Sequence, residues 1–237
     1  MAGRKWTREE LLVALWLYCR TDFGKLHSRN SDIIQIASKL DRTPGAIAMK
    51  ACNFASLDPS IERKGLGNVS STDKQLWEQF RADSTMIALE AESSFNKLVA
   101  PETERETISK ERLVQRFFRK AVLESYENRC AVTGMRKPEL LNAGHIIPWR
   151  VSKERRADPT NGIALNALHD RAFDRGLITF DEGLRLVLSP LLGNLAPVEV
   201  RKHFFSRFEG REIMKPERFH PDTSALEYHR KNVFLEG

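Results

Sequence analysis

Residues 143–150 read "AGHIIPWR" and place one titratable ring, His145, between small residues and an apolar run that ends in Pro-Trp-Arg. A histidine at the end of a short apolar strand is usually a hydrogen-bonded core residue. The same position also suits a catalytic base, because imidazole titrates near pH ~6.5. The residues that follow decide between these two interpretations.

The next segment, "DPTNGIALNALHDRAFDRG" at residues 158–176, carries turn, strand and helix signals in close succession. Asn161 and Gly162 predict a turn that leads into the strand "IAL", and Asn166 predicts the cap of the short helix "ALHDRAFD". With the strand that ends near His145, the predicted order is a hairpin followed by a helix.

Flanking segments extend this strand-rich α+β region. "LITFDEGLRLVL" at residues 177–188 predicts a second hairpin, with its turn at residues 181–183. "RCAVTGM" at residues 129–135 predicts a short strand and a turn. Upstream, "RLVQRFFRKAVLESY" at residues 112–126 predicts a strongly amphipathic helix.

"CAVTG", "AGHIIPW" and "NGIALNALHDRAFDRGLITF" together resemble the HNH endonucleases, and most closely the prokaryotic restriction-endonuclease-like members of that family. The resemblance is strongest over residues 110–190, and "GAIAMKACNFASLDP" and "HRKNVF" extend it along the chain. It implies an α+β fold in which an N-terminal all-helical, helix-turn-helix-like module precedes a ββα-metal HNH nuclease domain.

The resemblance also implies roles for three catalytic residues. His145 matches the general base that takes a proton from the attacking water, and Asn161 matches the residue that orients this histidine and the hairpin. His169 matches the last histidine, which is a metal ligand. Elementary chemistry agrees, because a neutral imidazole accepts a proton and a divalent ion such as Mg²⁺ or Mn²⁺ neutralises a leaving oxygen.

One departure concerns the residue before the first histidine. Many members have Asp or His there as a metal ligand, whereas this chain has Gly144. The cation must therefore find another protein ligand or rely on water and phosphate oxygens. Asp174, five residues after His169, is the candidate second ligand, and it could ligate directly, act through a water or hold another ligand in place. Asp170 is the next choice after Asp174. It is less favoured because one step along a helix turns its side chain well away from that of His169.

Cysteine usage and the N-terminus exclude other classes of protein. Cys19, Cys52 and Cys130 form no CxxC pair, so neither a disulfide framework nor a structural zinc site is expected. "MAGRKWTREE" has no apolar core and is not a signal peptide, and no apolar run reaches the roughly 18 residues of a spanning helix. These features favour a cytoplasmic protein without a membrane partner.

The first 60 residues predict three helices. Thr7 and Glu10 form a capping box before "ELLVALWLYCR", Ser31 precedes "DIIQIASKL", and Thr43 precedes "PGAIAMKACNFA". This trihelical pattern is typical of helix-turn-helix modules, in which the third helix reads DNA. Its candidate DNA-binding residues are Arg42, Lys50 and Asn53; the alternative is a three-helix bundle that contacts no DNA.

The predicted domains are a helix-turn-helix-like DNA-binding module at residues 1–60, a helical connector and linker at 61–110, and an HNH nuclease domain with flanking helices at 111–237. Within the connector, residues 71–98 read as one helical stretch. "VAPETERETISKE" at residues 99–111 is polar and charged, and is the best linker candidate.

Charge favours a polyanionic partner. The formal net charge is +6 and the calculated pI is about 9.3. Near His145, a basic cluster is either a solvated loop or a grip on DNA phosphates, and we favour the grip. The cluster consists of Arg150, Lys153, Arg155 and Arg156.

The sequence thus predicts a metal-dependent HNH endonuclease that hydrolyses DNA phosphodiester bonds in restriction or antiphage defence. Double-stranded DNA is the expected partner. A homodimer is also expected, because one ββα site cuts one strand. Two alternatives remain open: a DNA-binding regulator with a catalytically silent HNH fold, and an RNA-directed nuclease.

Overall fold

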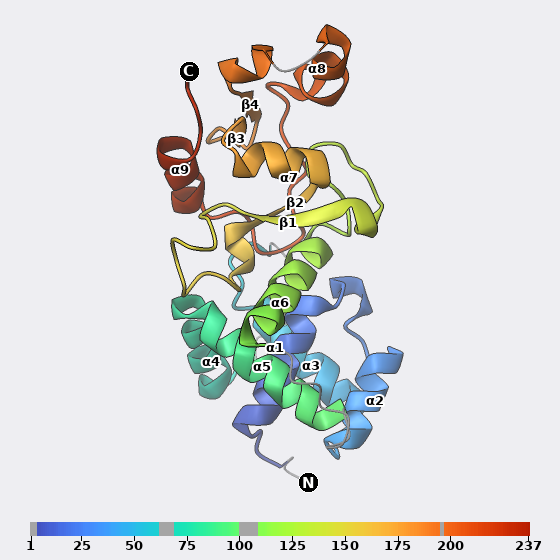
Figure 1. Ribbon diagram of the computed structural model, residues 1–237. Helices are drawn as coiled ribbons and strands as arrows, with labels where there is room; N and C mark the ends of the chain where they lie inside the picture. The colour runs from blue at the N-terminus through green and yellow to red at the C-terminus, as the bar shows by residue number, and fades with distance from the viewer. Residues whose placement is uncertain (1–3, 62–68, 100–108, 195–196) are drawn as a thin grey trace. The chain divides into compact units, whose positions relative to one another are not determined.

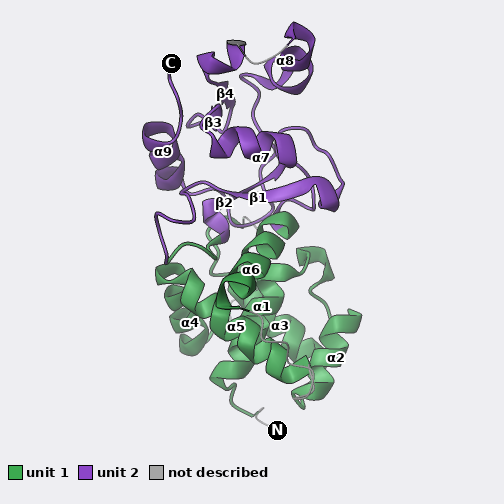
Figure 2. Cartoon of the chain, viewed as in Figure 1, with its two compact units in different colours: residues 1–124, 154–158 green, residues 125–153, 159–237 purple. Residues whose placement is uncertain are grey.

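The computed structural model describes residues 4–61, 69–99, 109–194 and 197–237. Its helices and strands divide between two compact units (Figures 1 and 2). Unit 1 comprises residues 1–124 and 154–158, and unit 2 comprises residues 125–153 and 159–237. The helices that begin in unit 1 are α1 (Arg8–Arg20), α2 (Ser31–Lys39), α3 (Pro44–Ala55), α4 (Ser71–Ala82), α5 (Ser84–Val99) and α6 (Lys110–Ser125), with a 3-10 turn at Phe23–Lys25.

Capping side chains fix the starts of the first helices. The predicted capping box of α1 is confirmed, because Thr7 Oγ1 accepts from Glu10 N at 3.3 Å and Glu10 Oε2 accepts from Thr7 N at 2.9 Å. For α2 the predicted cap is wrong by one residue. Asn30, not Ser31, caps this helix, and its Oδ1 accepts from Asp32 N at 2.8 Å.

The core of unit 1 involves helices well beyond the predicted trihelical module. α1 packs against α3 and α5, α2 against α3 and α5, and α4 against α5. Residues 71–98 form two helices rather than one, because the chain leaves helical geometry at Asp83. The first unit boundary along the chain lies between residues 124 and 125, whereas the predicted domain boundaries lie at residues 60 and 110.

The predicted linker at residues 99–111 lies mainly outside the described residues. Its described ends are helical, since Val99 closes α5 and Lys110 opens α6. The predicted amphipathic helix is confirmed as α6, which buries Val114, Phe117 and Phe118.

Unit 2 is built around an antiparallel pair of strands followed by a helix. β1 (Leu141–His145) pairs with β2 (Gly162–Asn166) so that His145 lies opposite Gly162. α7 (Ala167–Asp174) follows β2 directly, and Asn166 caps it as predicted. The strand predicted within residues 129–135 is wrong: the segment is a turn, closed by a bond from Gly134 N to the Cys130 carbonyl.

The second predicted hairpin is confirmed as β3 (Ile178–Phe180) and β4 (Leu186–Leu188). Asp181 Oδ1 shapes its turn by accepting from Gly183 N at 2.9 Å and Arg185 N at 2.8 Å. The remaining elements of unit 2 are α8 (Val198–Phe204), α9 (Thr223–Asn232) and 3-10 turns at Pro138–Leu140, Pro159–Asn161, Pro190–Asn194 and Ser206–Phe208.

A buried histidine fastens α9 to the rest of unit 2. The His229 ring stacks on Phe173 of α7 with 3.8 Å between ring centroids and 3° between planes. Its Nδ1 contacts Thr179 Oγ1 at 2.9 Å, and its Nε2 contacts the Phe173 carbonyl at 3.2 Å. The family-like segment "HRKNVF" therefore forms the attachment of α9 to α7 and β3.

This attachment should depend on pH. Burial lowers the pKa of His229 to about 4, whereas an unfolded histidine titrates near ~6.5. The unfolded state therefore binds the proton more readily than the folded state. The neutral His229 ring contributes its full stabilisation of the fold above about pH 6.5, and this contribution is lost as the pH drops toward 4. The loss should be on the order of 3 kcal/mol. Urea unfolding of wild type and His229→Gln at several pH values measures it, and an identical pH dependence in the two would contradict the assignment.

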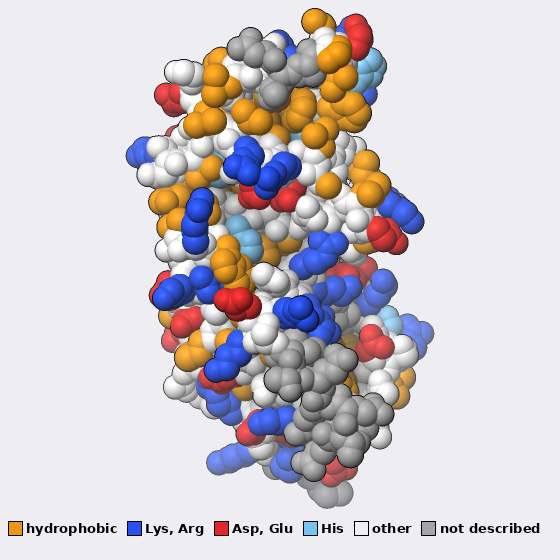
Figure 3. Space-filling view, viewed as in Figure 1, with side chains coloured by type: hydrophobic (Ala, Val, Ile, Leu, Met, Phe, Trp, Pro, Cys, Tyr) orange, Lys and Arg blue, Asp and Glu red, His pale blue; other side chains and the backbone are white. Residues whose placement is uncertain are grey.

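Two surface properties complete the fold. Among the described residues, no helix is long and apolar enough to cross a membrane. Exposed hydrophobic side chains gather around α8 (Figure 3) and form an apolar patch on the surface of unit 2. The patch consists of Leu168, Leu191, Val198, Val200 and Phe204.

Candidate active site

One open cleft of unit 2, with a volume of about 960 Å³, collects the chemically active side chains. β1 contributes His145, and α7 contributes the carboxylates Asp170 and Asp174. Arg171 on α7 and Arg175, which caps the C-terminus of α7, line the same cleft. The cleft therefore combines a titratable ring, two carboxylates and two guanidinium groups.

His145 is the last residue of β1 and its side chain is half-buried. The ring meets the edge of Trp149, with 5.5 Å between centroids and 84° between planes. This contact accounts for the tryptophan of the "IIPW" stretch, which packs against the candidate base. A ring at the end of a strand and on the wall of an open cleft has access to both a substrate and water.

Asn161 fixes the chain just beyond the candidate base. It is 1% exposed. Its Oδ1 accepts from Ile147 N at 2.8 Å, and its Nδ2 donates to the Ile147 carbonyl at 3.2 Å. A further bond runs from Ile146 N to the Asn161 carbonyl at 3.0 Å. The predicted role of orienting the loop after His145 remains a proposal, and this geometry supports it.

His169 lies in the interior and not on the cleft. It is 1% exposed. Asn166 Oδ1 accepts from His169 N at 2.9 Å, so the Asn166 amide nitrogen is the group 2.8 Å from His169 Nδ1 and donates to it. Nε2 then carries the proton and donates to the Phe204 carbonyl at 2.8 Å. With both ring nitrogens engaged, His169 has no nitrogen to offer a metal in this geometry.

Asp170 takes the position toward the cleft that His169 was expected to take. Adjacent residues on a helix differ in direction by about 100°, so only one of the two can face β1. Asp170 Oδ2 accepts from Asn142 Nδ2 at 2.8 Å. A Cβ built on Gly144 would lie 2.8 Å from Asp170 Oδ1. The carboxylate thus lies directly over Gly144, the position that lacks the family's acidic or histidine side chain.

Asp174 follows Asp170 by four residues and shares its face of α7. Desolvation raises the pKa of the Asp174 carboxyl, and the charges of Arg171 and Arg175 oppose that rise. The two carboxylates supply hard oxygen donors along one edge of the cleft. Such donors suit Mg²⁺ and Mn²⁺.

A complete metal cage is not preformed. Within residues 4–61, 69–99, 109–194 and 197–237, no three His, Cys, Asp or Glu side chains are grouped so as to hold a metal ion. In general, Mg²⁺ keeps several waters and binds through one or two carboxylates plus substrate phosphate oxygens. Asp170 and Asp174 fit such a site.

The basic residues predicted near His145 are divided between the two units. Arg150 is exposed and lines the cleft of unit 2. Arg155 and Arg156 belong to the segment of unit 1 at residues 154–158, where Arg155 Nε pairs with Asp158 at 2.9 Å. Arg171 and Arg175 were missed in the sequence, although one lies on the predicted helix and the other directly follows its last residue, four positions later.

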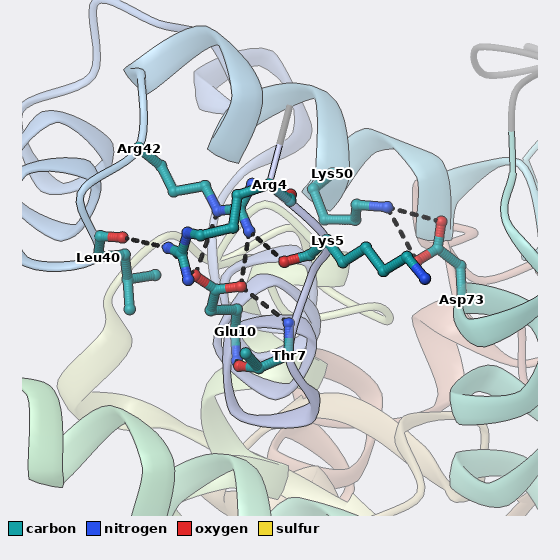
Figure 4. A network of polar contacts seen from close by, with 8 residues as sticks. All are labelled: Arg4, Lys5, Thr7, Glu10, Leu40, Arg42, Lys50 and Asp73. Carbon is teal, nitrogen blue, oxygen red and sulfur yellow. Dashed lines mark hydrogen bonds and ion pairs between the residues drawn. The ribbon is translucent and has the colours of Figure 1, made fainter. Parts of the chain in front are cut away.

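The candidate DNA-binding residues of α3 are buried in unit 1, and the expectation that they are exposed is wrong. Lys50 is 8% and Asn53 5% exposed. Lys50 Nζ lies 3.0 Å from Asp73 Oδ2 (Figure 4), and Asn53 Nδ2 donates to the same oxygen at 3.3 Å. Asp73 itself is fully buried. Lys50 therefore neutralises the buried Asp73 carboxylate, and Asn53 donates a hydrogen bond to it.

Arg42 is likewise committed to the interior of unit 1. It pairs with Glu10 at 2.8 Å and donates to the carbonyls of Arg4 and Lys5 at 2.9 and 2.8 Å (Figure 4). Its guanidinium also lies 4.1 Å from the centre of the Trp6 ring. The opening "KWTREE" thus encodes a packing and ion-pair network.

Comparison with known proteins finds a family match within unit 2. Residues 130–181 match the family model described as HNH endonuclease, and the resemblance read from the sequence is confirmed there. A solved structure titled "Modification dependent TagI restriction endonuclease" is 23% identical, with a TM-score of 0.33. The alignment covers 51% of this chain and 39% of that chain, so it spans less than half of that enzyme. No protein of curated function matches the chain.

Proposed function

We propose that the chain is a metal-dependent endonuclease that hydrolyses phosphodiester bonds of double-stranded DNA, and that residues 130–181, which match the HNH endonuclease model, carry this activity. One observation carries the proposal: His145, Asp170 and Asp174 line a single open cleft of unit 2. A base and two hard oxygen donors are what phosphodiester hydrolysis requires.

His145 is the general base. Its neutral imidazole takes a proton from a water positioned against the scissile phosphate. Trp149 limits the rotation of the ring through their edge contact. Asn161 secures the backbone at Ile147, two residues beyond the base. These contacts hold the ring ready before the substrate arrives, which lowers the cost of reaching the reactive geometry.

Asp170 and Asp174 are the residues that would hold the cation. We propose Asp170 in place of His169, and we retain Asp174 from the sequence analysis. A bound Mg²⁺ or Mn²⁺ would polarise the phosphate and neutralise the leaving oxygen.

Arg171 and Arg175 are proposed to neutralise phosphates next to the scissile bond, together with Arg150. Both side chains are exposed, Arg171 on α7 and Arg175 directly after its last residue, and both line the cleft. Arg155 and Arg156 remain proposed phosphate contacts. Guanidinium groups suit this task because they remain charged and can donate two hydrogen bonds to one phosphate.

The double variant Arg171→Gln/Arg175→Gln should therefore bind DNA with a weaker salt dependence. Each lost phosphate contact lowers the slope of log K against log salt concentration by about 0.9, so the slope should fall by nearly two units. Fluorescence anisotropy of a labelled duplex without divalent ions measures it. The matched control, Arg136→Gln/Arg211→Gln, removes two exposed charges of unit 2 outside the cleft. An equal fall in the control would contradict the assignment.

The decisive test of the function is a plasmid assay. Purified protein is incubated with supercoiled plasmid and Mg²⁺ or Mn²⁺, and in parallel with EDTA. Conversion to nicked or linear plasmid only with the metal supports the proposal. DNA binding without cleavage under all metals would favour the rival, a regulator with a silent HNH fold. Cleavage of RNA alone would favour the RNA-directed alternative.

We further propose that the protein acts in restriction or antiphage defence in the cytoplasm. We propose that it acts as a homodimer, because a double-strand break needs two strand cleavages. Sedimentation of the protein on a duplex tests the dimer. Plating of phage on cells that carry the wild-type chain or His145→Ala tests the biological role. Equal plaque numbers would contradict it.

A further inference from the structure

We infer that Asn142 and Gly144 form a seat on β1 that fixes the Asp170 carboxylate in the cleft and so sets the affinity of the site for its divalent cation. The inference rests on the proposed function, since it assigns Asp170 a cation. It adds two residues that the proposed chemistry does not itself require, and it gives the glycine before the base a positive role.

The two seat residues share one face of the strand. Asn142 and Gly144 are two positions apart on β1, and side chains of a strand alternate between its faces. α7 packs against β1, which brings Asp170 over this face. Asn142 lies opposite Leu165 of β2, and Gly144 opposite Ile163, so the pairing with β2 holds both seat residues in register.

Each seat residue acts on a different oxygen of the carboxylate. Asn142 Nδ2 donates to Asp170 Oδ2 at 2.8 Å. Asp170 Oδ1 occupies the space above Gly144, only 2.8 Å from where a Cβ would stand. One donor bond uses one of about four lone-pair sites of a carboxylate. The group can therefore be held by Asn142 and still ligate a cation.

Glycine is needed at this position for the carboxylate and not for the backbone. Gly144 is not among the residues with positive φ, so any residue can adopt its backbone conformation. The other atoms near a Cβ, the Ile163 carbonyl oxygen and Leu165 Cδ1, lie at 3.6 Å, which is ordinary contact. A single methyl group at residue 144 would thus displace one thing, the Asp170 carboxylate.

Asn142 and Gly144 are accordingly positioning residues. Fixing a ligand before the cation arrives raises affinity, and loss of such supporting contacts typically weakens metal binding by about 10–100-fold. Asp170 is half-buried, so its carboxylate can move away if the seat is altered. Asp174, on the same face of α7, would then remain to bind the cation with lower affinity.

The test is a calorimetric titration with Mn²⁺ alone, without DNA. Gly144→Ala and Asn142→Ala should each weaken binding by about 10–100-fold, and Asp170→Ala at least as much. The double variant Gly144→Ala/Asp170→Ala should bind no more weakly than Asp170→Ala, because the methyl group then has nothing to displace. The control is Gly45→Ala on α3, where an added Cβ meets nothing within 4 Å.

Thermal unfolding of each variant shows whether the fold is kept; if Gly144→Ala fails to fold, Asn142→Ala decides the outcome. Wild-type affinity in folded Gly144→Ala would overturn the seat and leave the nuclease proposal standing. The seat would also be overturned if the Mn²⁺ affinity of Gly144→Ala/Asp170→Ala fell by the product of the two single effects. If the wild type binds no Mn²⁺, the cation of the proposed function is lost as well.

Discussion

His145→Ala is expected to lower the rate constant for DNA cleavage by about 10²–10⁴-fold while the affinity for DNA stays near that of wild type. A general base acts on the proton that moves in the transition state, so its loss appears in kcat rather than in ground-state binding. The ring is half-buried at a strand end, and its removal should leave the β1–β2 pairing intact. Single-turnover plasmid nicking with saturating enzyme measures the rate directly.

His220→Ala is the matched control, since it removes an exposed histidine of unit 2 that does not line the cleft. The base assignment is contradicted if His145→Ala and His220→Ala cut at the same rate. The same assay also tests the rival function, because a regulator with a silent HNH fold would cleave no plasmid as wild type or as either variant. A rate that falls only through weaker DNA binding would mark His145 as a contact residue.

Much of the HNH region could be predicted from the sequence because its signals are local. Asn161-Gly162 marks the turn, Asn166 the helix cap and Gly176 the helix end, and each acts within a few residues. Such backbone chemistry needs no knowledge of the tertiary fold. The order of strand, strand and helix therefore emerged from the sequence, and the order places His145 and Asn161 near one another.

The assignment of His169 shows where this reasoning ends. The chain offers two candidate ligands in adjacent positions, His169 and Asp170, and a helix directs them about 100° apart. Helix geometry separates the two side chains but does not determine which of them faces β1. That choice depends on Phe204, whose carbonyl accepts from His169 across 35 positions of sequence. Only the fold reveals such a partner.

Unit 1 presents the same limit. Caps and periodicity predicted α1 and α3 with their starts, because these signals again are local. The partner of Lys50 is Asp73, which lies 23 positions further along the chain on α4. A polar residue on a predicted helix reads as exposed unless its buried partner is known. The helix-turn-helix interpretation therefore placed Lys50 and Asn53 on the wrong side of α3.

Lys50→Ala should accordingly destabilise unit 1 by about 3–5 kcal/mol, because it leaves the carboxylate of Asp73 buried and without its cation. Asp73 is 0% exposed, and its remaining donors are the neutral amide of Asn53 and the backbone of Ser70. Urea unfolding followed by tryptophan fluorescence measures the loss, since Trp6, Trp16 and Trp77 all lie in unit 1.

Lys74→Ala, which removes the same charge from an exposed position of α4, serves as control and should change stability little. The double variant Lys50→Ala/Asp73→Ala should be more stable than the sum of its single effects predicts, by about 0.5–3 kcal/mol, because it removes both members of the pair. A DNA-reading Lys50 predicts the reverse pattern: stability near wild type, with the salt slope of DNA binding reduced by about one unit. Since the two interpretations predict changes in different measurements, four variants (Lys50→Ala, Asp73→Ala, the double variant and Lys74→Ala) decide whether this lysine stabilises unit 1 or contacts DNA.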